Sequence, residues 1–190
     1  VFPIKEVADI GRKLGVPLIM DNTAAPLLCR PFDHGAAVVM YSTTKWLGGH
    51  GTSIGGVLVD GGNFDWEAGG DRFPSLNHPD PSYHGAIWTE AVKPLGPIAY
   101  ILRARVILLR DVGAATTPSN AFNVIQGLET LSLRMREHCA NAIQVVDYLT
   151  NHKKVETVIH PSVQDGEFKR RADAYLKDGY GSLVGFELKD

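Results

Sequence analysis

Short runs of consecutive apolar residues mark the first third of the chain. They occupy residues 16–20, 36–41 and 54–59, and the first two end directly at Asp21 and Ser42. Such runs are typical of strands that are buried on both faces, as in parallel sheets between layers of helices. This part of the chain is therefore predicted to form one flank of an open α/β sheet.

Helical spacing of apolar residues is found elsewhere in the chain. A first helix is predicted between Pro3, which suits the first turn of a helix, and Gly15, which suits its end. In the same way, Gly113 is predicted to end a helix and Thr117 to cap the next one. The predicted helices after the first cover residues 98–112, 117–131, 133–152 and 168–176, and two further strands are predicted at 154–160 and 182–188.

Two features concern the organisation of the chain. Residues 61–97 are dominated by Gly, Pro, Asp, Asn and His and are predicted to form a long loop. A structureless loop of that length in a compact domain is usually functional or part of an interface. A domain boundary is predicted near residues 151–154, where a long helix is followed by a small mixed α/β unit.

Composition and charge limit the classes of function. The chain has 190 residues, 44% of them hydrophobic and 21% charged, and a formal net charge of −2, which is ordinary for a soluble globular protein. The charge balance argues against a nucleic-acid binder. No run approaches the ~20 apolar residues of a membrane span, and no signal peptide is expected. The two cysteines, Cys29 and Cys139, cannot form a disulfide framework and suit a reducing, cytoplasmic setting.

The densest group of polar residues directly follows the second predicted strand. It consists of Ser42, Thr43, Thr44 and Lys45, while Asp21 ends the first predicted strand. Ligands of open α/β sheets bind outside the carboxyl ends of the strands, so these residues are expected to face one crevice. A lysine, a carboxylate and hydroxyls are the groups that pyridoxal phosphate needs for its aldehyde, its ring nitrogen and its phosphate. Spacing alone also allows a solvated lysine, a capping aspartate and simple turn hydroxyls.

Other cofactor sites find little support in the sequence. The glycines around Gly48–Gly51 match neither a phosphate-binding P-loop nor a dinucleotide fingerprint. No metal site is expected, because the histidines and cysteines lack the spacing of zinc ligands. Cys29 has no activating histidine nearby in sequence, and a buried thiol is the favoured interpretation.

Three motifs together resemble those of a known family. They are Asp21-Asn22-Thr23, Ser42-Thr43-Thr44-Lys45-Trp46 and Gly49-His50-Gly51. This composite is similar to the pattern of the Cys/Met-metabolism enzymes that use pyridoxal 5'-phosphate. The resemblance implies an α/β structure of the aspartate-aminotransferase-like fold (fold type I).

The resemblance also implies roles for individual residues. Lys45 would be the catalytic lysine that forms the Schiff base with the cofactor, and Asp21 would pair with the pyridinium nitrogen. Ser42 and Thr44 would bind the phosphate, and Thr23 would lie against the cofactor ring.

Within the family, the chain is most similar to the O-acetylhomoserine sulfhydrylase branch. The segment 62–85 and the stretch Gln126-Gly127-Leu128-Glu129-Thr130-Leu131 carry this similarity. It implies replacement of acetate on O-acetylhomoserine by sulfide or a thiol, giving homocysteine or methionine. Two alternatives stay open: a cystathionine γ-synthase or γ-lyase type reaction, and a catalytically incompetent piece with a structural or interaction role.

Members of this family are considerably longer than 190 residues. The chain is therefore expected to be the central part of such an enzyme. Residues 1–152 would be part of the large cofactor-binding domain, with the end of its open sheet, and residues 153–190 the start of the small C-terminal α/β domain. The resemblance also implies a homo-oligomer, a tetramer, and the composition described above suits a cytoplasmic protein that binds neither nucleic acid nor membrane. By itself the chain is expected to have little or no turnover.

Overall fold

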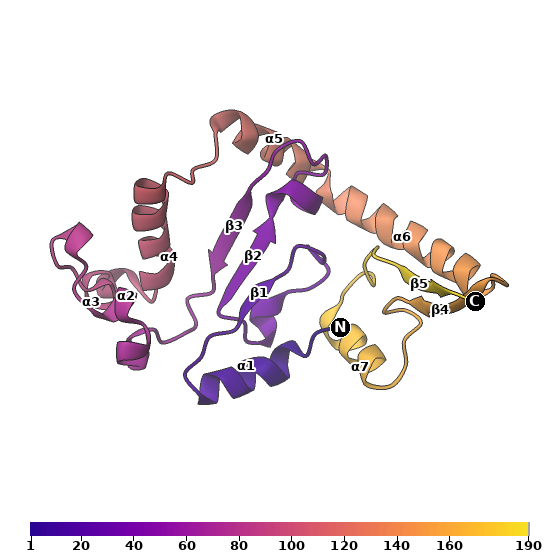
Figure 1. The fold of residues 1–190 in the computed structure, drawn as a ribbon, viewed down its shortest axis with the longest axis horizontal. Coiled ribbons are helices and arrows are strands. Elements are labelled where there is room, and N and C mark those ends of the chain that lie inside the picture. Colours follow the sequence, from indigo (N-terminus) through magenta and orange to yellow (C-terminus); the bar gives the residue numbers. More distant parts are fainter. Residues whose placement is uncertain (190) are drawn as a thin grey trace.

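The structure is a computed structural model that describes residues 1–189, and a three-stranded sheet lies at its centre (Figure 1). The strands are β1 (Ile19–Asp21), β2 (Val38–Ser42) and β3 (Gly56–Asp60), in the order β1-β2-β3. β1 and β2 are parallel, with Asp21 level with Met40. Their carboxyl ends therefore point to the same edge of the sheet, as the sequence predicted.

The third strand corrects the prediction of a wholly parallel sheet. β3 runs antiparallel to β2, with Ser42 opposite Gly56. Parallel strands need a crossover to the far end of the sheet, whereas an antiparallel strand can return from the same end. The chain between β2 and β3 stays at that end, where the backbone N–H of Thr43 donates to the carbonyl of Gly55 at 2.9 Å.

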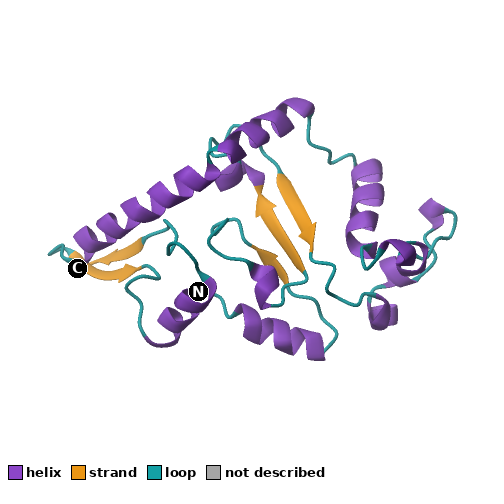
Figure 2. Cartoon of the chain, turned by 180° about the vertical axis from the view of Figure 1, so that it is seen from behind, coloured by secondary structure: helices purple, strands orange, loops and turns teal. Residues whose placement is uncertain are grey.

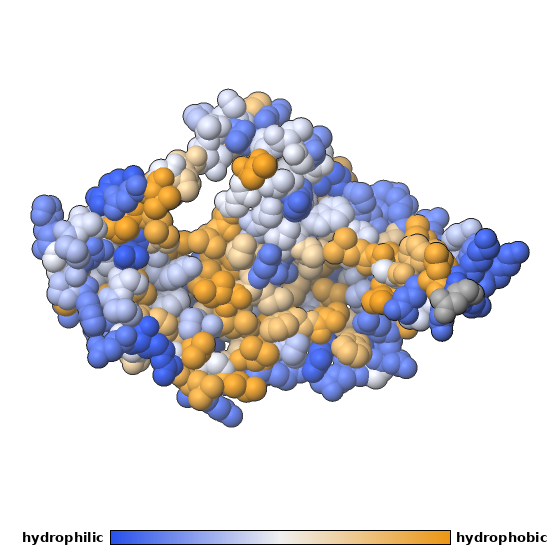
Figure 3. All heavy atoms as spheres, viewed as in Figure 1, coloured by the Kyte–Doolittle hydropathy of each residue, from blue (hydrophilic) through white to orange (hydrophobic). Residues whose placement is uncertain are grey.

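Burial of the strands also differs from the prediction. Val38 and Val39 of the central strand are buried, whereas Val57 and Leu58 of β3 are 38% and 43% exposed. The difference follows from position, because β1 and β3 are the outer strands of the sheet in the described residues. Apolar residues consequently gather on the surface across the middle of the face in Figure 3.

Residues 61–97 are not the long loop that their composition predicted. Five short helical elements occupy the segment: η3 (Glu67–Arg72), α2 (Pro74–Asn77), η4 (Pro81–Tyr83), α3 (Trp88–Ala91) and η5 (Lys93–Leu95). Trp66, Leu76 and Trp88 form a buried core with later helices. Asp80 orders the turn, since its carboxylate accepts from the backbone N–H of Ser82 at 2.9 Å and from Trp88 Nε1 at 2.8 Å. Helices this short span too few residues to show a hydrophobic periodicity in the sequence.

The other helices lie close to their predicted positions. Thr117 caps α5 by accepting the backbone N–H of Asn120 at 3.3 Å, and Gly113 ends η6 with φ +73°. Met135 and Cys139 are among the buried residues of α6. The helices are α1 (Ile4–Lys13), α4 (Ala99–Arg103), η6 (Ala104–Val112), α5 (Pro118–Glu129), α6 (Leu131–Thr150) and α7 (Gly166–Tyr175), with η1 (Pro31–His34) and η2 (Thr43–Leu47) beside the sheet.

α6 connects the central sheet to a second, two-stranded sheet. Both views show this long helix running from the end of β2 to the antiparallel strands β4 (Val155–Ile159) and β5 (Gly185–Leu188), which α7 separates in sequence (Figures 1 and 2). These strands pair with each other and not with the central sheet. β4 begins where the sequence predicted a domain boundary, although the two-domain division itself stays a prediction.

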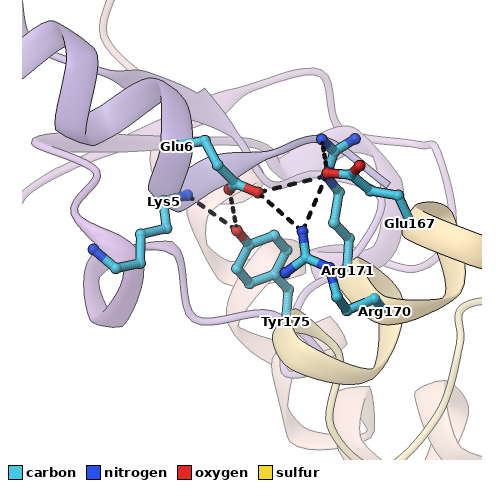
Figure 4. Close-up of polar contacts among 6 residues, drawn as sticks. All are labelled: Lys5, Glu6, Glu167, Arg170, Arg171 and Tyr175. Atoms are coloured by element: carbon cyan, nitrogen blue, oxygen red, sulfur yellow. Dashed lines mark hydrogen bonds and ion pairs between the residues drawn. The ribbon is translucent and has the colours of Figure 1, made fainter.

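Polar contacts join the C-terminal helix α7 back to α1 (Figure 4). The Tyr175 hydroxyl donates to Glu6 Oε2 at 2.6 Å and accepts from the backbone N–H of Lys5 at 3.2 Å. Arg171 lies 3.7 Å from Glu6 Oε1. The hydrogen bond from Tyr175 lowers the pKa of the Glu6 carboxyl. These contacts thus hold α7, near the end of the chain, against α1 at its start.

Candidate active site

The ends of β1 and β2 open into one cavity of about 700 Å³. Four residues proposed from the sequence line it: Asp21, Thr23, Thr44 and Lys45. Ser42 is not among the lining residues, although it lies at the end of β2 beside them. The topology therefore brings together a carboxylate, an amine and two hydroxyls that are as much as 24 positions apart in sequence.

The Asp21 carboxylate is exposed at the end of β1. Its Oδ1 accepts the backbone N–H of Thr23 at 2.9 Å, the local turn that aspartate often forms. Within residues 1–189, Oδ2 accepts no hydrogen bond, so one oxygen of this carboxylate is free to accept a proton donor from the cavity.

The residues after Asp21 tie the two strand ends together. Thr23 Oγ1 accepts the backbone N–H of Ser42 at 2.7 Å. Asn22 is buried, and its Nδ2 donates to the carbonyl of Cys29 at 3.0 Å and to the Tyr41 hydroxyl at 3.1 Å. These bonds satisfy a buried polar side chain and fix the position of Asp21 relative to β2.

Lys45 lies on a tight, irregular turn that follows β2. Its backbone angles, φ −91° and ψ −120°, interrupt the helical turn η2. The backbone N–H of Gly49 donates to the Lys45 carbonyl at 2.8 Å. Thr44 Oγ1 accepts the backbone N–H of Gly55 at 3.1 Å, which joins the turn to the start of β3. The turn thus places Lys45 at the cavity while its neighbours hold the backbone.

The other residues that line the cavity include Trp46, Arg134 and His138. None of these three was predicted from the sequence to belong to the site. The rings of Trp46 and His138 meet edge to face at 4.8 Å, and the Arg134 guanidinium donates to the Trp46 carbonyl at 2.8 Å. Arg134 and His138 are four positions apart and share one helix face, but no sequence signal places that face beside Lys45.

The cavity fits pyridoxal phosphate in size and in chemical groups. Its volume lies within the ~300–1,000 Å³ of typical ligand sites. Lys45 provides an amine, Asp21 a carboxylate with a free oxygen, and Thr23 and Thr44 hydroxyls. No group of three or more metal-ligating side chains occurs among residues 1–189.

Cys29 does not contribute a nucleophile to this site. Burial, with a smaller contribution from the charge of Asp33, raises the pKa of its thiol to about 11. The thiolate is the reactive form of cysteine, so Cys29 is unreactive near neutral pH, in agreement with the sequence interpretation.

Comparison with known proteins identifies close relatives. The family profile described as Cys/Met metabolism PLP-dependent enzyme matches residues 1–190. The chain is 46% identical over 187 residues to the homocysteine synthase of Schizosaccharomyces pombe, covering 97% of this chain and 43% of that protein. It is 45% identical over 193 residues to the O-acetyl-L-homoserine sulfhydrylase of Leptospira meyeri, covering 98% and 43%.

A solved structure shares the fold. The crystal structure of an O-acetylhomoserine (thiol)-lyase from Campylobacter jejuni superposes with a TM-score of 0.90 at 34% sequence identity, covering 100% of this chain and 47% of that one. That structure contains N'-pyridoxyl-lysine-5'-monophosphate. The present chain thus spans less than half the length of the relatives that it matches. Among residues 1–189, no helix combines the length and apolar character needed to cross a membrane.

Proposed function

The chain belongs to the Cys/Met metabolism PLP-dependent enzyme family, and from this membership we propose its function. In a protein of the relatives' length, it replaces the acetate of O-acetylhomoserine by sulfide or a thiol, which gives homocysteine or methionine. The observation that carries the proposal is the convergence of Asp21 and Lys45 on one cavity. The family and the fold predicted from the sequence are confirmed by the comparisons.

Lys45 and Asp21 have the central roles in this proposal. Bound pyridoxal phosphate would supply an electron sink for the negative charge that develops on the amino acid. Lys45 is the amine that would hold the cofactor aldehyde, and when free it would take the proton from Cα as a general base. Asp21, through its free oxygen, would keep the ring nitrogen protonated. The cavity that both residues line supports these roles.

The hydroxyl groups near the strand ends complete the proposed cofactor site. Thr44 lines the cavity and would bind the phosphate together with Ser42, which directly ends β2. Thr23 would lie against the cofactor ring, since its Oγ1 already contacts the Ser42 backbone at the cavity edge. Hydroxyl and backbone N–H groups are suitable donors to phosphate.

The remaining proposals concern the protein as a whole. Residues 1–152 would be part of a large cofactor-binding domain and residues 153–190 the start of a small C-terminal domain. The protein would be a cytoplasmic homotetramer that acts on an amino acid and a sulfide or thiol. Cys29 and Cys139 support a reducing location because both are free thiols.

Cofactor attachment tests the proposed function. The purified protein is mixed with pyridoxal phosphate, its visible spectrum is recorded, and borohydride reduction is followed by peptide mapping. We expect a reduced adduct on Lys45, its loss in K45A, and its retention in K93A. Lys93 is a suitable control because it is exposed and pairs with Glu67 at 3.0 Å, away from the cavity. Adducts distributed over other lysines, with none on Lys45, would refute the proposed role.

A further inference from the structure

Arg134 of α6 makes an unusual set of contacts for a partly exposed arginine. Its Nη1 donates to the Trp46 carbonyl at 2.8 Å, its Nη2 to the Gly127 carbonyl at 2.7 Å, and its Nε to Thr130 Oγ1 at 3.1 Å. It has no ion pair with a carboxylate within residues 1–189. The guanidinium thus joins the turn after Lys45 to the corner between α5 and α6.

The backbones that Arg134 joins are packed too closely for side chains. A Cβ at Gly127 would lie 2.2 Å from the Gly48 carbonyl oxygen, and a Cβ at Gly49 would lie 2.7 Å from Arg134 Cζ. Gly49 also has φ +76°, a conformation that favours glycine. The turn is therefore enclosed between α5 on one side and the planar guanidinium on the other.

We infer that Arg134 is a positioning residue for Lys45, an inference that rests on the proposed function. The carbonyl held by Nη1 belongs to Trp46, the residue directly after Lys45. Fixing that peptide group limits rotation of the irregular backbone at Lys45, and so fixes where the lysine side chain enters the cavity. A lysine at position 134 would keep the charge but lose the rigid fork that reaches three acceptors at once.

Hydrogen–deuterium exchange tests the contact without any cofactor. The amide of Gly49 reports on the turn because it donates to the Lys45 carbonyl. Hydrogen bonds to charged groups suggest a rate increase of about 10- to 100-fold at Gly49 in R134Q, and a smaller one in R134K. The amide of Val39 in β2 should be unchanged. Arg136 is exposed on the same helix, so R136Q is the matched control and should match the wild type.

Cofactor attachment supplies the second measurement. In R134Q the adduct should still form on Lys45, but with a lower yield and a changed visible circular dichroism, which depends on ring orientation. If the Gly49 amide exchanges at the same rate in R134Q as in the wild type, and the adduct forms normally on Lys45, the inference is overturned and the proposed function stays intact. Faster exchange in R134Q with no adduct on Lys45 in the wild type would overturn the proposed function and, with it, the positioning role. If the backbone amides of R134Q lose their protection from exchange throughout the chain, the variant is unfolded. The exchange rate at Gly49 and the adduct on Lys45 are then measured in R134K, and the same outcomes decide the positioning role of Arg134.

Discussion

Substitution of Gly127 by alanine separates helix propensity from packing in this structure. In an exposed helix interior, alanine is more favourable than glycine by about 1 kcal/mol. In α5, however, the added Cβ would lie 2.2 Å from the Gly48 carbonyl oxygen and 2.7 Å from the Leu47 carbonyl oxygen. Both neighbours are backbone atoms of the turn after Lys45, so the contact cannot be relieved by turning a side chain.

The packing effect should exceed the propensity effect. An ordinary Cβ–oxygen contact is longer by roughly 1 Å, and overpacking of this kind costs about 1–3 kcal/mol. A contact this short with backbone atoms belongs in the upper part of that range, about 2–3 kcal/mol. Subtracting the gain in propensity of about 1 kcal/mol, we expect G127A to lower the free energy of unfolding by about 1–2 kcal/mol. We also expect weaker attachment of pyridoxal phosphate, because the displaced backbone belongs to the proposed cofactor site.

Urea unfolding followed by tryptophan fluorescence measures the stability change. Gln126 precedes Gly127 on α5 and is exposed, so Q126A provides a control for helix propensity and should change stability by less than about 0.5 kcal/mol. If G127A is as stable as the wild type or more stable, α5 does not pack against the turn as closely as described. The packing reason for a glycine at position 127 then fails as well.

Three further outcomes are expected. Y175F should lower stability at neutral pH, because the hydrogen bond from Tyr175 holds the pKa of the Glu6 carboxyl below its ordinary value of 4.5. This stabilising contribution is present above the unfolded-state pKa and is lost as Glu6 is protonated, so the difference should shrink as pH falls below that ordinary value. An unchanged difference at pH 3, measured by urea unfolding, would contradict this. Cys29 should react with iodoacetamide at pH 8 only after unfolding, because burial raises the pKa of its thiol to about 11 and only the thiolate reacts. Rapid labelling of the native protein, mapped by mass spectrometry, would argue against its burial. The 190-residue chain alone should form little or no homocysteine, because positioning is worth ~7–11 kcal/mol of barrier and its relatives are more than twice as long; turnover at rates typical of the family would disprove this.

Local sequence patterns predicted the elements that carry the site. The apolar runs identified β1 and β2, and their polar ends at Asp21 and Ser42 lie at one edge of the sheet. The sequence patterns predicted the wrong structure in two places, the direction of β3 and residues 61–97. The return of β3 at the same end of the sheet depends on a turn closed by Thr43 and Gly55, and the short helices of residues 61–97 depend on a core around Trp66. Both arise from tertiary contacts that periodicity does not encode.

The surroundings of Lys45 show what a single sequence leaves out. Lys45 is noticed because a lysine and hydroxyls follow a buried strand, whereas Arg134 resembles any arginine on an amphipathic helix. Its contact with Trp46 spans 88 positions, and only the folded chain shows it. Gly127 offers a weaker sign, because glycine inside a helix costs about 1 kcal/mol relative to alanine and calls for a packing reason. The close approach to Gly48 supplies that reason, so the residues that determine the shape of the turn are those whose local propensities are unfavourable or unremarkable.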